Sequence, residues 1–246
     1  MNSSEIAILK KGAAAPDTYI SGMKRNSEWH GFERHVTNGT TAYYSNYYYA
    51  YLYFMDMACA INRGVSPQGY VGTVSAGCIG KCSCTVKGQC ISSMRTAIQS
   101  KLRDTGLVCE DKDTGLVTRI ASWSELLVGN SNNNSNKALF FYGTAIHVIT
   151  DAFAHSTYYN GIRINHDSGA DSVAHIPNRY KCAEYFTKRA LEHILLFEAG
   201  NVTDISCIMP VYDGSFKMGF LSSYVKAISL EYYNHNYTFL DRINID

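Results

Sequence analysis

The longest patterned stretch of the chain is residues 136–155, in which apolar side chains dominate and few polar positions interrupt them. It follows the polar run 129–136, whose asparagines and serines are good helix N-caps. Its polar positions His147, Asp151 and His155 are each four residues apart, so they share one face of a helix. The pattern predicts a long buried helix that carries three metal-type side chains on one side.

Six other segments have helical patterns. The aromatic stretch 41–61 lacks glycine and proline and is apolar nearly all round, which is typical of a buried helix. Strand-type alternation of apolar and polar positions is weak throughout the chain. We therefore predict an all-α protein, a single multi-helix domain over residues 1–246 with long loops around a multinuclear metal site. The other helices are expected at 5–15, 92–104, 118–128, 179–199 and 215–233, with a loop at 18–40.

Composition constrains the partners more than the fold. The chain is 46% hydrophobic and 17% charged and has a formal net charge of +1, so bulk charge indicates no nucleic-acid or acidic-lipid partner. No uncharged apolar run reaches the length of about 18 residues that predicts a membrane span. Residues 1–11 lack the apolar core of a signal peptide. We expect a secreted protein if a leader has been removed, and a cytoplasmic one otherwise.

Half of the eight cysteines lie at about residues 62–91, a stretch rich in glycine and serine that we expect to be a loop inserted between helices. An even count is compatible with disulfides, although the spacing does not give their connectivity. A zinc knuckle is the alternative, with Cys82 and Cys84 closer than usual for a zinc-binding pair. The clustered residues are Cys78, Cys82, Cys84 and Cys90; the others are Cys59, Cys109, Cys182 and Cys207.

The polar triplet of the central helix indicates metal binding. An aspartate between two histidines on an otherwise apolar helix is costly to bury without a compensating partner. A metal ion would compensate all three side chains at once, and mixed imidazole and carboxylate donors suit zinc best, with manganese and iron as alternatives. One helix cannot complete the coordination of a metal, so loops must supply further ligands. The expected loop ligands are Asp17, His30, His166 and Asp171, with His35 and His175 as alternatives to the two histidines.

Several of these residues fall in a pattern that resembles the zinc-dependent phospholipase C superfamily. The pattern begins with the Ala-Pro-Asp turn at Asp17 and the Trp-His pair at His30, and continues with Phe-Tyr-Gly-x3-His-x3-Asp-x3-His, which ends at His155. It covers residues 12–190. The superfamily also contains single-strand nucleases and the catalytic domain of glycosylphosphatidylinositol-specific phospholipase D. The three-residue gap before His155 looks more like the phospholipase D branch.

The resemblance implies an all-α phosphodiesterase with two or three zinc ions. The implied ligands of the first zinc are Asp17, His30, His147 and Asp151. Those of the second are His155 with a histidine and a carboxylate of the 166–175 loop, for which we predict His166 and Asp171. Asp151 would bridge toward a third ion. Two parts of the family pattern are not matched, namely a histidine upstream of the Pro-Asp turn and a final His-x3-Glu.

We therefore expect a metal-dependent phosphodiester hydrolase, and specifically a phospholipase C-like enzyme that cleaves phospholipids during transient contact with a membrane surface. Clustered zinc ions would neutralise phosphate oxygens and activate water, while Asp17, as the catalytic residue, would orient or deprotonate that water. Near-zero net charge argues against a stable nucleic-acid partner, and the oligomeric state stays open. The alternatives are a nuclease, a helical phosphohydrolase built on His166-Asp167, and a non-catalytic, metal-stabilised secreted binding or effector domain.

Overall fold

The computed structural model describes most of the first 153 residues and three shorter segments after them. The described residues are 1–18, 27–37, 39–45, 47–70, 95–111, 113–153, 156–159, 162–166 and 177–198. They fall into two compact units: unit 1 is Met1–His30 with Tyr49–Val148, and unit 2 is Gly31–Tyr48 with Ile149–Asp246. The single domain over residues 1–246 stays a prediction, and the helix expected at 215–233 lies outside the described residues.

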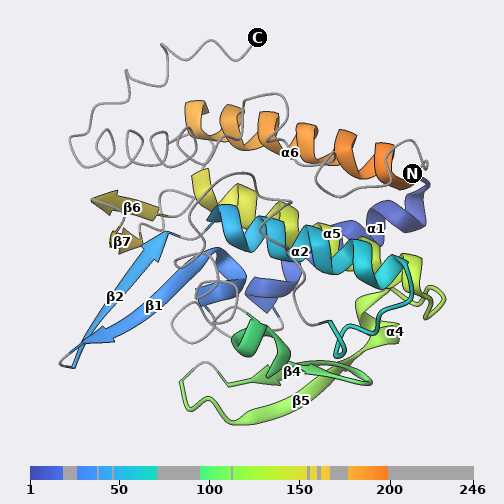
Figure 1. The fold of residues 1–246 in the computed structure, drawn as a ribbon, viewed down its shortest axis with the longest axis horizontal. Helices are drawn as coiled ribbons and strands as arrows, with labels where there is room; N and C mark the ends of the chain where they lie inside the picture. The colour runs from blue at the N-terminus through green and yellow to red at the C-terminus, as the bar shows by residue number, and fades with distance from the viewer. Residues whose placement is uncertain are drawn as a thin grey trace. The chain divides into compact units, whose positions relative to one another are not determined.

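Helices make up most of the described chain, and short antiparallel strands lie between them (Figure 1). The helices are α1 (Ser3–Thr18), α2 (Tyr47–Asn62), α4 (Trp123–Leu126), α5 (Asn134–Phe153) and α6 (Pro177–Glu198), with a 3-10 turn η1 (Ser27–His30). The strands are β1 (Phe32–Thr37), β2 (Thr40–Ser45), β3 (Leu102–Arg103), β4 (Gly106–Glu110), β5 (Val117–Ser122), β6 (Ser156–Tyr159) and β7 (Ile162–His166).

The predicted all-α class is wrong, because the described residues form two antiparallel sheets. Unit 2 holds a sheet of strand order β1-β2-β7-β6, and unit 1 holds one of order β3-β4-β5. The segment predicted as a helix at 41–61 begins as β2, and the segment at 118–128 begins as β5 before it turns into α4. Threonine in both strands, tyrosine in β2, and valine and isoleucine in β5 favour extended backbone.

The side chain of Asp111 builds the turn that joins β4 to β5. Its Oδ1 accepts hydrogen bonds from the backbone N–H groups of Asp113 and Thr114, at 3.1 and 2.7 Å, and from the Thr114 hydroxyl at 2.8 Å. Gly115 follows with a φ of 70°, a backbone conformation that favours glycine. The chain therefore reverses at this point, and β4 and β5 pair as a hairpin.

Helices α1 and α5 cross so closely in unit 1 that their backbones are in contact. A Cβ atom added to Gly12 would lie 1.9 Å from the carbonyl oxygen of Phe140, and one added to Gly143 would lie 2.1 Å from the carbonyl oxygen of Leu9. These positions leave no room for a methyl group, so both require glycine. The crossing packs the middle of α1 against the first half of α5.

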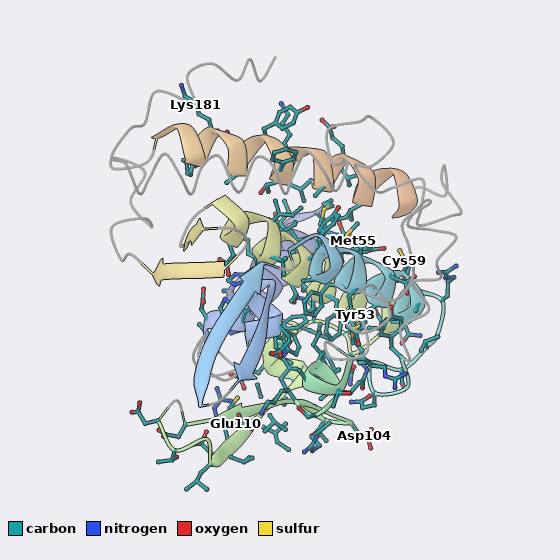
Figure 2. The ribbon with its side chains drawn as sticks, turned by 60° about the vertical axis from the view of Figure 1, so that its left-hand side comes forward. Tyr53, Met55, Cys59, Asp104, Glu110 and Lys181 are labelled. Atoms are coloured by element: carbon teal, nitrogen blue, oxygen red, sulfur yellow. The ribbon has the colours of Figure 1, made fainter. Side chains whose placement is uncertain are left out.

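Helix α2 supplies the aromatic centre of the core of unit 1. Tyr53 and Phe54 are fully buried, and Figure 2 shows Tyr53 and Cys59 among the crowded side chains around this helix. The Cys59 sulfur lies 3.1 Å from the hydroxyl oxygen of Tyr142 on α5, which ties the two helices together. The predicted helix is therefore correct from Tyr47 onward, and its burial is confirmed by the described side chains from Ala50 onward.

Cys59 and Cys109 are buried thiols. The four clustered cysteines and Cys207 lie outside the described residues, as does the side chain of Cys182. Disulfides, or a zinc knuckle within the inserted loop, therefore stay predictions.

The buried tyrosines of unit 1 should make the protein sensitive to alkali. Burial raises the pKa of Tyr51, Tyr53 and Tyr70 far above the ordinary value near 10, and the adjacent Asp56 carboxylate, which accepts a hydrogen bond from the Tyr70 hydroxyl, raises that of Tyr70 further. In the unfolded chain these groups lose their protons above about pH 10, while in the folded chain they keep them. Stability should therefore fall with rising pH, by about 1.4 kcal/mol per pH unit for each tyrosine.

Urea unfolding between pH 9 and pH 11 measures this slope. Tyr51→Phe removes one ionising hydroxyl and should make the slope above pH 10 shallower by about 1.4 kcal/mol per pH unit. A flat profile through pH 11, or an unchanged slope in the variant, would contradict the burial of these hydroxyls.

Candidate metal centre

Three of the predicted ligands come together in unit 1: Asp17, His30 and His147. One ligand atom from each lies within 4.8 Å of the others, so the group could hold a metal ion. Asp17 stands at the end of α1, His30 is the last residue of η1, and His147 lies in α5. His30 and His147 are 117 residues apart in sequence, so the group exists only because of tertiary packing.

The distances suit a small, compact ion. His30 Nδ1 and His147 Nε2 are 3.1 Å apart, and the Asp17 carboxylate oxygens lie 3.9 Å from His30 Nδ1 and 4.0 Å from His147 Nδ1. Donors that bind one zinc tetrahedrally at about 2.0–2.2 Å are about 3.3–3.5 Å from one another. The two imidazole nitrogens His30 Nδ1 and His147 Nε2 are thus nearly at zinc-binding separation. The Asp17 oxygen at 4.0 Å faces the other nitrogen of the His147 ring, so the three donors, now within 4.8 Å, would have to draw together around one ion.

The three donors differ in their access to solvent. His30 is 1% exposed and His147 is 6% exposed, whereas the Asp17 side chain is 52% exposed. The two rings meet edge to face, with centroids 5.0 Å apart. The group therefore combines two buried imidazoles with a carboxylate that reaches the surface.

Trp29 anchors His30. Its side chain is fully buried, and its ring lies 5.2 Å from that of Phe54 on α2. Because His30 is the next residue, this packing holds η1 against the core and limits the positions that the imidazole can take. The sequence pattern includes the Trp-His pair but does not predict this anchoring role.

The sequence also does not predict the role of Gly12 and Gly143, which allow the close crossing of α1 and α5. The available signal is a glycine inside each of two helical patterns, where it weakens a helix and calls for a packing reason. Neither pattern says which helix is the partner, so the crossing is visible only in the structure.

The other predicted ligands are not tested by the described residues. Asp151 lies one turn beyond His147 on α5 and is 2% exposed, but it belongs to unit 2, and its bridging role stays a prediction. His166 ends β7, and its side chain is outside the described part of the chain. The alternative ligand His35 lies in β1, and its side chain is likewise not described. The remaining candidates, His155, Asp171 and His175, lie outside the described residues.

Comparison of the chain with models of protein families, with curated proteins and with solved structures found no match. Within the described residues, no helix combines the length and the apolar character that crossing a membrane requires.

Proposed function

We propose that the protein is a zinc-dependent phosphodiester hydrolase whose metal centre includes Asp17, His30 and His147. The observation that supports the proposal is the donor set itself: two buried imidazoles and one half-exposed carboxylate within 4.8 Å. Structural zinc sites are closed by four protein ligands, whereas catalytic sites use three and leave one position for water or substrate. Within the described part of the chain the group has three donors, the number that a catalytic site uses.

The chain's own residues have distinct tasks in this proposal. His30 and His147 are held by the core and would bind the ion through neutral ring nitrogens. The exposed position of Asp17 would let its carboxylate orient a water molecule, or accept its proton, beside the scissile phosphate. A bound zinc ion would supply Lewis acidity toward the phosphate oxygens and lower the pKa of bound water toward about 7.

Phospholipids remain the preferred substrate class. The formal net charge of +1 gives no long-range attraction to a polyanion such as nucleic acid. A phospholipid headgroup presents a single phosphodiester, which could reach the donor set from the side on which Asp17 is exposed. Further zinc ions, held with Asp151, His155, His166 and Asp171, belong to the same proposal.

The test is metal analysis combined with a hydrolysis assay. Protein purified without added metal should carry at least one zinc per chain, and it should hydrolyse bis(p-nitrophenyl) phosphate and phosphatidylcholine vesicles. Chelation should abolish both activities, and added zinc should restore them. A chain without zinc would refute the proposal. Stoichiometric zinc without turnover of either substrate, or of single-stranded DNA, would instead identify a non-catalytic, metal-stabilised domain.

A further inference from the structure

We infer that Thr144 is a positioning residue for the metal centre. Its hydroxyl replaces a backbone hydrogen-bond donor that α1 lacks at Pro16. The resulting bond between the helices fixes Asp17 relative to His147. The inference rests on the proposed function, since it concerns the metal that Asp17 and His147 would share. It adds a residue that is neither a ligand nor part of the family pattern.

The first step is the missing donor. In an α-helix the carbonyl of each residue accepts a hydrogen bond from the N–H four residues later. For Gly12 that residue is Pro16, which lies inside α1 and has no N–H. Gly12 is buried, so bulk water is a poor substitute, and a buried carbonyl without a donor is destabilising.

The second step is the replacement. The Thr144 hydroxyl oxygen lies 3.3 Å from the Gly12 carbonyl oxygen, in a buried setting. It is also 3.3 Å from the carbonyl oxygen of Phe140, four residues earlier on its own helix. The bond to Phe140 is ordinary for a helical threonine. The bond to Gly12 crosses to another helix and supplies the donor that the proline lacks.

The third step links this bond to the ligands. Thr144 precedes His147 by three residues on α5, and Pro16 directly precedes Asp17 on α1. The Gly12–Gly143 contact brings the two backbones so near that a side chain as short as threonine spans the gap. The hydrogen bond therefore holds the two helices together about one turn from a ligand on each. Contacts that orient metal ligands in this way typically change metal affinity by about 10–100-fold.

The primary variant is Thr144→Val, which keeps the side-chain shape and removes the hydroxyl. We expect its zinc dissociation constant, measured by competition with a chromogenic chelator, to rise about tenfold. Thr144→Ser should restore most of the affinity. Thr118→Val is the matched control, because the Thr118 hydroxyl also donates to a carbonyl, that of Cys109 at 3.1 Å, but on β5. This control should leave the zinc dissociation constant unchanged.

Pro16→Ala makes the test specific, since alanine returns an N–H to the Gly12 carbonyl. In metal-free protein, Thr144→Val should lower Tm by about 2–4 °C when Pro16 is present. It should have little effect on Tm or on zinc affinity in the Pro16→Ala background. Equal effects in both backgrounds would overturn the inference, because the hydroxyl would then act through Phe140 or through packing alone. A lower Tm with unchanged zinc affinity would also overturn it, since the role would be structural only.

The two proposals fail in different ways. If the wild-type chain binds no zinc, the proposed function and the positioning role both fall, while the Tm cycle on metal-free protein still shows whether Thr144 satisfies Gly12. If the wild type binds zinc but the cycle shows no coupling, only the role of Thr144 is refuted.

Discussion

Replacing His147 by glutamine should abolish zinc binding at the centre that this histidine forms with Asp17 and His30. His147 is buried, and its Nε2 faces His30 Nδ1 at 3.1 Å. A neutral amide is a weak zinc ligand compared with imidazole. Since a catalytic metal contributes several kcal/mol to transition-state stabilisation, hydrolysis should fall by about a thousandfold or more. Zinc content per chain and turnover of bis(p-nitrophenyl) phosphate measure the two effects.

The variant should also lose the stabilisation that zinc would give the wild type. At a free zinc concentration a hundred times the dissociation constant, binding stabilises the fold by about 2.7 kcal/mol, which corresponds to roughly 5–10 °C in Tm. His193→Gln on α6, a histidine outside the predicted ligand set, serves as the control and should keep both zinc and activity. Full zinc content and turnover in His147→Gln would exclude His147 as a ligand.

Replacing Gly143 by alanine is expected to destabilise the fold by about 3 kcal/mol or more, because the new methyl group would overlap with backbone. Its Cβ would lie 2.1 Å from the carbonyl oxygen of Leu9 and 2.8 Å from the backbone nitrogen of Ala13. Alanine in a helix interior gains about 1 kcal/mol over glycine in helix propensity. The clash should exceed that gain, since neither backbone atom can rotate away. Urea unfolding of the metal-free protein gives the free-energy difference.

Zinc affinity should fall together with stability in Gly143→Ala, because separating α1 from α5 moves Asp17 away from His147. Gly69→Ala is the matched control: its Cβ would meet only the side-chain oxygen of Ser66 within 3 Å, and that oxygen can rotate. An alanine variant at Gly143 as stable as the wild type would show that the helices do not cross in contact.

The sequence predicts the bounds of α5 to within two residues, because a long apolar run preceded by a polar asparagine stretch is a strong helix signal. The prediction of residues 136–155 compares with Asn134–Phe153 in the structure. Helix α6 spans Pro177–Glu198, which is similarly close to the predicted range 179–199. Long elements with one clear period are therefore readable from local pattern alone.

The strands were missed because their signals are short and adjoin helical ones. Residues 40–45 run directly into the tyrosine-rich start of α2, and tyrosine suits a strand and a buried helix alike. The stretch 117–122 carries β-branched residues after a turn that contains Asp113 and Gly115, which is a hairpin signal. The helix begins only after Ser122, which is the N-cap of α4.

The sequence predicts the three residues of the metal group but not the residues that hold them in place. Asp17, His30 and His147 carry side chains whose chemistry is visible in sequence. Trp29 acts through its packing in the core. Thr144 acts through a hydrogen bond to a carbonyl on another helix. Which backbone group lacks a donor can be read from Pro16, but the residue that supplies the donor depends on how distant helices cross.

The crossing of α1 and α5 also has a consequence for biosynthesis. Gly12 and Thr144 are 132 residues apart, and ribosomes add about 5–20 residues per second, so α1 is complete roughly 7–26 s before the segment that it packs against exists. During that interval the Gly12 carbonyl, which lacks the N–H of Pro16, has no native partner. Zinc would reach its full donor set only after this late, long-range docking. The metal should therefore slow unfolding while leaving the folding rate almost unchanged.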